Sequence, residues 1–290
     1  MMFKAQRFFV ARFVLILTLL SGMFGAMPAR SVHAATLVAP HSMNAYRNNA
    51  SISPGETARV SVNSSNLQGN NHSYYPSVSA DGRYIAFASY ANNLVANDLN
   101  GGYDTFVRDT LTDVTEHVSV DSNGIQANGD SYNLSISGDG RYIAFESYAT
   151  NLVPEDTNQA SDIFVRDIQT GITTRVSVDS SGLQADGASN YPSISADGRY
   201  VTFVSYASNL VPGDSNGRDD IFVHDIQTGL TLRASVDSSG MEANDWSSMP
   251  SISGDGRYVA FYSYATNLGS GDITPETATP TPSATPTTTI

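Results

Sequence analysis

Short apolar runs separated by turn-forming residues recur along the chain from about residue 57 onward. Residues 84–87 read Tyr-Ile-Ala-Phe without a polar interruption, residues 163–165 read Ile-Phe-Val, and residues 175–178 alternate between polar and apolar side chains. Unbroken runs are typical of strands buried on both faces, and alternation is typical of strands with one face in water. The pattern therefore predicts an all-β protein.

One phrase of nine residues organises this pattern. Residues 79–87 read S-A-D-G-R-Y-I-A-F, and closely similar phrases stand at 137–145, 195–203 and 253–261. The four copies lie 58 residues apart, without insertion or deletion. A fixed period of several tens of residues indicates a protein built from repeated structural units.

Each repeat contains four predicted strands. In the first complete repeat they cover residues 77–79, 83–90, 105–108 and 116–120, and an extra copy of the fourth strand stands at 58–62. The first strand has one apolar residue between serines, which suits a crowded axis, the second and third carry the unbroken apolar runs, and the fourth alternates. A four-stranded antiparallel sheet with this order of burial is the blade of a β-propeller.

An Asp-Gly pair joins the first and second strands of every repeat. A two-residue turn there requires positive φ, so the pattern predicts hairpin glycines preceded by turn aspartates. The phenylalanine that ends each phrase is predicted to lie in the core between blades. The glycines are Gly82, Gly140, Gly198 and Gly256; the aspartates are Asp81, Asp139, Asp197 and Asp255; the phenylalanines are Phe87, Phe145, Phe203 and Phe261.

The phrase S-x-D-G-R-Y-I-A-F, followed about twenty residues later by D-I-F-V-R-D, resembles the repeat of TolB-like, WD-related β-propeller proteins. The resemblance covers about residues 58–272, and the chain departs from it in having longer loops after the second and fourth strands. The resemblance implies a scaffold whose members bind proteins, peptides or glycans, or lie beside a catalytic domain. It does not imply an activity of its own.

The repeats predict about four blades. The extra strand at 57–63 is expected to join the strands at 249–264 and so to close a ring of four units, although a third strand for that blade is missing. The fourth repeat stops after Asp272 and passes into a Thr/Pro-rich segment at 273–290, which is typical of a linker or tail. The alternative is an incomplete or truncated part of a larger propeller.

The first 34 residues are predicted to be a secretory signal peptide. Basic residues precede an apolar stretch at 13–20, and residues 32–34 form a small-x-small cleavage site. We therefore assign residues 1–34 to the signal, 35–56 to a leader and 57–272 to the propeller. The expected location of the protein is extracellular or periplasmic, with no membrane association after cleavage.

The charge of the chain narrows the range of partners. Removal of residues 1–34 leaves 11 arginines, no lysine and all 28 acidic residues, a net charge of −17. Such a surface disfavours nucleic acid and anionic membranes as partners and favours cations. The chain has no cysteine, so its stability must come from a packed core or from bound metal rather than from disulfides.

The chain lacks a nucleophile elbow, a P-loop, a zinc-protease helix motif and a dinucleotide fingerprint. His117 and His224 stand where other repeats have arginine, and we expect them at the surface. Nearly every acidic residue recurs in the repeats, which indicates a structural role. We therefore expect a secreted, non-catalytic binding module. The alternatives are a propeller enzyme and the accessory propeller of a larger secreted hydrolase or lyase.

Antiparallel order places the loops after the second and fourth strands on one face of the blades, and loops on a rigid scaffold commonly carry binding residues. Aromatic residues in these loops are suited to a platform for a protein, peptide or glycan. The alternative is that the loops pack on one another. The candidate ligand-binding residues are Trp246, Tyr75, Tyr132 and Tyr191.

The loops after the second strands carry a recurring Asp-x-Asn spacing, with a further aspartate six places after the first. Calcium takes several hard oxygen ligands, which closely spaced side chains on a tight loop supply. The alternative is a set of ordinary Asx turns that lead into the third strand. The candidate calcium ligands are Asp98, Asn100, Asp104, Asp156, Asn158, Asp162, Asp214, Asn216 and Asp220.

Overall fold

The computed structural model describes residues 57–269. The predicted signal peptide, the leader and the Thr/Pro-rich segment lie outside these residues. The regular elements of the described part are strands. A search of residues 57–269 finds no helix of sufficient length and apolarity to cross a membrane.

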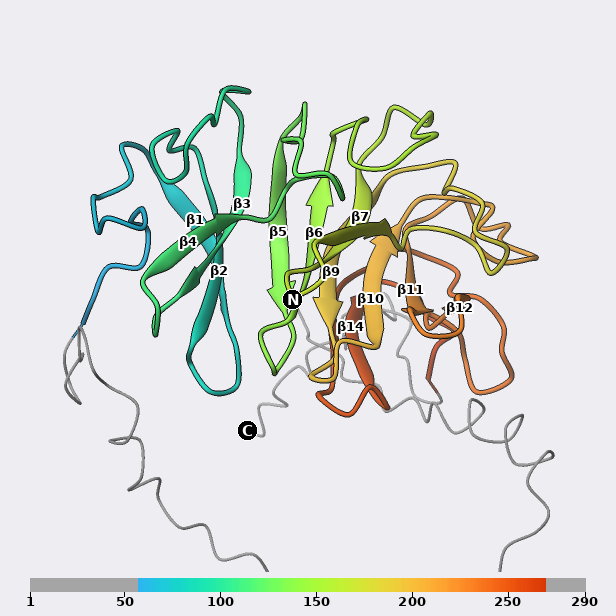
Figure 1. The fold of residues 1–290 in the computed structure, drawn as a ribbon. Helices are drawn as coiled ribbons and strands as arrows, with labels where there is room; N and C mark the ends of the chain where they lie inside the picture. The colour runs from blue at the N-terminus through green and yellow to red at the C-terminus, as the bar shows by residue number, and fades with distance from the viewer. Residues whose placement is uncertain (1–56, 270–290) are drawn as a thin grey trace, which may run out of the picture.

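The strands of the described residues form four sheets (Figure 1). The first sheet consists of β1 (Ser73–Val78), β2 (Tyr84–Ser89), β3 (Asp104–Asp109) and β4 (Val114–His117). The second consists of β5 (Ser131–Ile136), β6 (Tyr142–Ser147), β7 (Asp162–Asp167) and β8 (Ile172–Arg175). The third consists of β9 (Ser189–Ile194), β10 (Tyr200–Ser205), β11 (Asp220–Asp225) and β12 (Leu230–Arg233), and the last of β13 (Ser247–Ile252) and β14 (Val259–Ser263).

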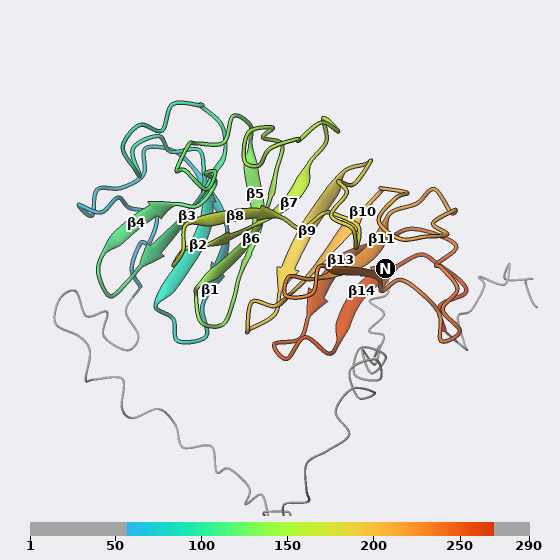
Figure 2. The ribbon, with the colours of Figure 1, turned by 45° about the vertical axis from the view of Figure 1, so that its right-hand side comes forward.

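Each four-stranded sheet runs in chain order and is antiparallel throughout, as predicted for a blade. The sheets follow one another along an arc, and their first strands pack side by side, β1 on β5, β5 on β9 and β9 on β13 (Figures 1 and 2). Corresponding strands of the three complete sheets begin 58 residues apart. The predicted fold class is confirmed: an all-β, propeller-type array with three four-stranded blades and a partial fourth.

The predicted closure of a four-unit ring is wrong for the residues that the structure describes. The segment at 57–63 does not pair with residues 249–264 there but lies on the first blade, where the Val62 carbonyl oxygen accepts a 2.6 Å hydrogen bond from Thr115 Oγ1. The same contact, also of 2.6 Å, joins Val120 to Thr173 of the second blade. The segment that precedes each blade therefore packs on that blade, and the ends of the arc stay apart.

The fourth strand is displaced from its predicted position. It ends at His117, so most of the predicted run at 116–120 lies beyond it, and Val120 forms only an isolated bridge with Gln126. Between Val120 and Gln126 an Asx turn reverses the direction of the chain. Asp121 Oδ1 accepts hydrogen bonds from the backbone N–H groups two and four residues later, at 2.8 and 2.7 Å. The alternating pattern was correct for a half-exposed strand, but the backbone ladder stops at His117, and beyond it the Thr105 N–H donates at 3.0 Å to Ser119 Oγ instead of to a backbone carbonyl.

Facing phenylalanines fill each blade. Phe145 of β6 stacks on Phe164 of β7 with ring centroids 5.8 Å apart, and both rings are fully buried. Phe145 also shares a core cluster with residues of β2 and β3, so the blade packs on its predecessor. The prediction of core phenylalanines is confirmed, because the buried residues include Phe87, Phe145, Phe203 and Phe261.

The Asp-Gly turns are hairpin turns as predicted, and they also allow neighbouring blades to pack closely. Gly140 has a φ of 76°, and a Cβ atom there would lie 2.2 Å from Cδ2 of Tyr84 in the preceding blade. Asp139 Oδ1 accepts hydrogen bonds from Ser137 Oγ at 2.6 Å and from the Arg141 N–H at 3.0 Å. Only glycine meets both the conformational and the steric requirement of this turn.

A bidentate ion pair links the start of the second strand to the end of the third strand. Arg141 donates from Nε at 2.9 Å and from Nη2 at 2.6 Å to the two carboxylate oxygens of Asp167. Such pairs are among the strong hydrogen bonds of proteins. The hydrogen bond from Arg141 is the main cause that lowers the pKa of Asp167 to about 2. The other complete blades carry the pairs Arg83–Asp109 and Arg199–Asp225.

We expect the substitution Phe145→Ala to lower the free energy of unfolding by about 3–5 kcal/mol, because it leaves a cavity between two blades. Denaturant unfolding measures this difference. The control is Leu67→Ala, at a side chain that is 62% exposed. The control should cost about 0.5 kcal/mol or less, and a similarly small cost for Phe145→Ala would contradict the position of β6 in the core.

The Arg141–Asp167 pair should make stability fall in acid. The folded pKa of about 2 lies below the ordinary 3.8, so the contribution is fully present above pH 3.8 and is lost as the pH falls toward 2. The shift corresponds to about 2 kcal/mol. Asp167→Asn should therefore differ from the wild type most above pH 4 and least near pH 2 in denaturant unfolding. A pH-independent difference, or the same profile for the exposed-loop control Glu155→Gln, would contradict this assignment.

Candidate functional site

The two long connections of each complete blade meet on one face, where a cluster of polar side chains joins them. In the second blade, Gln184 Nε2 donates to Asp156 Oδ1 at 2.9 Å and to Asp162 Oδ2 at 2.8 Å. Arg175 lies 3.7 and 3.6 Å from the same two carboxylates. We call this group of two aspartates, one basic residue and one Gln or Glu a polar node. It fastens the loop after the second strand to the loop after the fourth.

The first blade has the same node with a histidine in place of the arginine. Gln126 Nε2 donates to Asp98 at 2.8 Å and to Asp104 at 3.0 Å, and His117 Nε2 lies 3.0 Å from Asp104 Oδ1. His117 is half-buried in this node. His224 is buried as well, with Nδ1 2.9 Å from a threonine hydroxyl. The prediction that these two histidines are surface residues is wrong, because each takes over the hydrogen-bonding position of an arginine.

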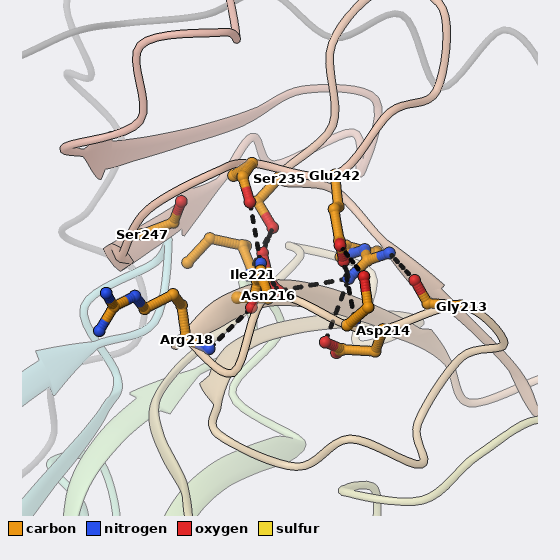
Figure 3. A network of polar contacts seen from close by, with 12 residues as sticks. Gly213, Asp214, Asn216, Arg218, Ile221, Ser235, Glu242 and Ser247 are labelled. Atoms are coloured by element: carbon orange, nitrogen blue, oxygen red, sulfur yellow. Dashed lines mark hydrogen bonds and ion pairs between the residues drawn. The ribbon is translucent and has the colours of Figure 1, made fainter.

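Figure 3 shows the node of the third blade, in which Glu242 replaces the glutamine. Arg233 Nη1 donates to Glu242 Oε2 at 2.6 Å and lies 3.4 Å from Asp214 and 3.3 Å from Asp220. One oxygen from each of the three acids lies within 4.8 Å of the others. A single guanidinium therefore faces three carboxylates.

Burial is the largest influence on the pKa of four aspartates in the nodes. It raises the pKa of Asp98, Asp162 and Asp220, and it raises the pKa of Asp214 to about 6. A raised carboxyl pKa means that the charged form is less well stabilised in the fold than in water. The partners within each node thus compensate the buried charge only in part.

The asparagines of these loops serve as turn residues. Asn158 Oδ1 accepts a 3.0 Å hydrogen bond from the Ala160 N–H, which makes an Asx turn, and Asn158 Nδ2 donates at 3.0 Å to the carbonyl oxygen of Ala185 in the other loop. Asn100 and Asn216 make both kinds of bond as well. Their side chains therefore staple the two loops together.

The structure brings the nine candidate calcium ligands together in three groups, an arrangement that both the calcium hypothesis and the turn hypothesis require. Each aspartate pair already has a protein partner, an amide in the first two nodes and the Arg233 guanidinium in the third. The donor set of the third node suits calcium best, because Asp214, Asp220 and Glu242 each offer a carboxylate oxygen. Glu242 was not among the predicted ligands, and calcium binding stays a prediction.

Three of the four candidate aromatic residues lie on neighbouring first strands. Tyr75 of β1 and Tyr132 of β5 stack with ring centroids 6.3 Å apart and ring planes at 27°. Tyr75 and Tyr191 line one groove of about 420 Å³. Trp246 lies before β13, where the Arg218 guanidinium stands 5.2 Å from its ring, and it does not line this groove. The candidate set is therefore brought together in part.

A bulge in each first strand shapes the groove. Tyr75, Asn133, Tyr191 and Met249 have φ values of 52°, 42°, 53° and 51°. This left-handed region is rarely adopted by tyrosine and methionine and more readily by asparagine. The strand register also shifts at this place in all four sheets. The bulge explains why the first strands start at Ser73 and its equivalents, four residues before the predicted start. The sequence pattern reads the bulge as a loop, because alternation is interrupted there.

Six tyrosines of the first two blades form a continuous cluster. Tyr103 joins its parts, with its ring centroid 4.1 Å from that of Tyr90, 6.2 Å from Tyr74 and 6.1 Å from Tyr132. Four members are exposed to solvent, Tyr74, Tyr75, Tyr90 and Tyr148. We define the tyrosine cluster as Tyr74, Tyr75, Tyr90, Tyr103, Tyr132 and Tyr148.

Sequence reasoning missed three members of the tyrosine cluster, Tyr90, Tyr103 and Tyr148; Tyr74 lies in the same predicted loop as Tyr75. A signal for Tyr103 was present in the departures from the repeat. The positions equivalent to Tyr103 hold Ser161 and Asp219. Residues that differ between copies of a repeat are free of the scaffold's constraints, so they are where a ligand-specific surface is expected.

One buried acid beside the groove does not recur in the other blades. Glu146 of β6 is 2% exposed, and its Oε2 accepts hydrogen bonds from Asn133 Nδ2 at 2.8 Å and from the Tyr191 N–H at 3.3 Å. Burial raises the pKa of this carboxyl group. Because we read the acids as a repeated set, Glu146 was missed. A position-by-position comparison finds it, since the equivalent residues are Ala88, Val204 and Tyr262.

No family model matches the chain, and no curated protein matches it. Solved β-propeller structures do. TolB from Acinetobacter baumannii matches at 18% identity and a TM-score of 0.40, over 67% of this chain and 38% of its own. The tricorn protease matches at 14% identity and a TM-score of 0.43, over 69% of this chain and 15% of its own. An oligogalacturonate lyase from Vibrio parahaemolyticus matches at 14% identity and a TM-score of 0.41, over 69% of this chain and 48% of its own.

The chain is thus similar in fold to TolB and to other β-propeller proteins, as its repeats predict. It spans less than half the length of these three matched chains. The matched proteins include proteases and a lyase, so the shared fold does not select a function. The function has to be argued from the surface of this chain.

We expect calcium to raise the melting temperature, mainly through the third node. With a dissociation constant of about 10⁻⁴ M, millimolar calcium stabilises the fold by about 1.4 kcal/mol at an occupied site. In a chain of this length the gain is roughly 3–5 °C. Thermal melts with calcium and with chelator measure it, and Asp214→Asn should remove most of the difference, whereas the half-buried control Asp245→Asn, outside the node, should keep it. Identical melts in the two buffers would leave the nodes as protein-only staples.

Proposed function

We propose that the protein is a secreted, non-catalytic binding module that takes its ligand on the tyrosine cluster and the adjoining groove. The observation that supports this proposal is the exposure of adjacent tyrosines on a scaffold that buries its phenylalanine pairs. Tyr75 is 51% exposed and Tyr148 is 49% exposed, whereas Phe145 and Phe164 are both 0% exposed. Contiguous exposed aromatic surface in a soluble protein commonly marks an interaction site.

Tyrosine is suited to this task for physical reasons. Its ring provides a large contact area at a low cost in conformational entropy, and its hydroxyl group forms directional hydrogen bonds. Tyr74, Tyr75 and Tyr132 lie on strands, and Tyr90, Tyr103 and Tyr148 are each adjacent to a strand end. A ligand therefore meets a surface that is largely formed before binding, which lowers the cost of association. We infer a protein, peptide or glycan ligand. The net charge of −13 argues against nucleic acid and anionic membranes, and the predicted signal peptide supports export.

The contacts of the acidic residues favour binding over catalysis. The paired carboxylates of the polar nodes are held by glutamine, arginine or histidine, and Glu146 hydrogen-bonds to Asn133 and Tyr191. Glycoside hydrolysis requires two carboxyl groups that flank the scissile bond. The alternative is a propeller enzyme, or the accessory propeller of a larger secreted hydrolase or lyase. Turnover in a hydrolase and lyase panel that one loop substitution abolishes would favour that alternative.

We expect Tyr103→Ala and Tyr75→Ala each to weaken ligand binding by about tenfold or more, because central aromatic residues carry most of the energy of an interface. A peptide library and a glycan array on the purified chain identify the ligand, and calorimetry measures its affinity. The matched control is Tyr206→Ala, at a tyrosine of the third blade that is 58% exposed and lies outside the tyrosine cluster. Equal loss in the control and in the cluster variants would refute the assignment of the surface.

A further inference from the structure

Two residues of the second blade depart from the repeat together. At the bulge of the first strand the other blades have Tyr75, Tyr191 and Met249, and at the buried position of the second strand they have Ala88, Val204 and Tyr262. The second blade has Asn133 and Glu146 at these positions, and the two side chains are hydrogen-bonded at 2.8 Å. Two departures that contact one another in the same blade indicate one functional unit rather than two unrelated changes.

The hydrogen bond sets the direction of the Asn133 amide. A carboxylate accepts hydrogen bonds and donates none, so Glu146 engages the NH₂ group of Asn133 and leaves Oδ1 for another partner. Asn133 is also a lining residue of the 420 Å³ groove, where the other lining residues are tyrosine, proline, leucine and methionine. Oδ1 of Asn133 therefore offers a hydrogen-bond acceptor on a lining residue whose neighbours in the groove are aromatic and aliphatic.

The surroundings of Glu146 indicate the charge of the ligand that the groove binds. The groups that hydrogen-bond to this buried carboxyl are Asn133, Tyr132 and the backbone of Tyr191, and none of them is cationic. Burial raises the pKa of this carboxyl group, and a cation nearby would favour its charged form, because charges interact strongly where the dielectric constant is low. The NH₂ group of Asn133 is bonded to Glu146, so Oδ1, the negative end of the amide dipole, lies on the side away from that bond.

We propose that Asn133, backed by Glu146, recognises a guanidinium or primary ammonium group carried by a basic peptide, with the rings of Tyr75 and Tyr191 beside it. The proposal rests on the proposed binding function and names the class of its ligand. A cation gains from the carbonyl oxygen, from the aromatic faces and from the acidic surface of the whole chain. A neutral glycan would also donate hydrogen bonds to the carbonyl oxygen, but it would gain nothing from the buried charge.

The test compares two blocked pentapeptides by calorimetry on the full chain, one with arginine at its centre and one with citrulline, which has nearly the same shape and no charge. We expect the arginine peptide to bind about tenfold more tightly or better. Glu146→Gln should remove this preference while it preserves the volume of the side chain. The pair Asn133→Tyr with Glu146→Ala should remove it as well, and since it reproduces the residues of the first blade, it keeps the fold if Glu146→Gln does not.

Glu116→Gln is the matched control, because it removes one exposed carboxylate from β4 and should leave the preference unchanged. An equal loss with this control would mean a general effect of surface charge and would overturn the proposal. Equal affinity for both peptides in the wild type would overturn it too. A fully acetylated chito-oligosaccharide is the neutral probe. If it binds equally well to the wild type and to the variant with both Asn133→Tyr and Glu146→Ala, the proposal is overturned and the proposed binding function is retained. Absence of any ligand on the tyrosine cluster would instead count against the proposed function itself.

Discussion

The burial of the two middle strands of each blade between neighbouring blades is the constraint on which the rest of the structure depends. The chain has no cysteine, so this packing must hold the array together. Stacked phenylalanine pairs such as Phe145–Phe164 fill the blades, and the Asp-Gly turns leave room for a tyrosine of the preceding blade. The repeat length follows from the same requirement, because each unit must present equivalent surfaces to the units on either side.

The polar nodes solve a problem that this packing creates. Connections of more than ten residues on one face need partners for their polar groups, and the repeated aspartates supply them. The residues opposite these aspartates differ from blade to blade, as His117, Arg175 and Arg233 illustrate. The link between the two loops is kept in every complete blade. The extent to which a basic side chain balances the charge of the carboxylates varies from blade to blade. The third node, with Glu242, sets three carboxylates against one guanidinium.

The surface proposed for binding lies where the copies differ. The scaffold needs small or apolar residues at the core positions of every blade, but it places few demands on the exposed side of the first strands. There the first two blades gather tyrosines, and the second adds the Asn133–Glu146 pair. A buried acid costs stability unless it is well compensated. Its retention in one blade is therefore easier to explain by recognition than by folding.

The sequence by itself determined the period, the strand order, the hairpin glycines and the core phenylalanines, because these depend on local alternation, local turn chemistry and exact repetition. It also identified Tyr75, Tyr132 and Tyr191, although not the groove that Tyr75 and Tyr191 share. Only the tertiary structure decided that the ends of the arc stay apart, that the first strands bulge, and that Glu146 lies under Asn133. These features depend on which side chains meet across paired strands and between blades, which periodicity does not encode.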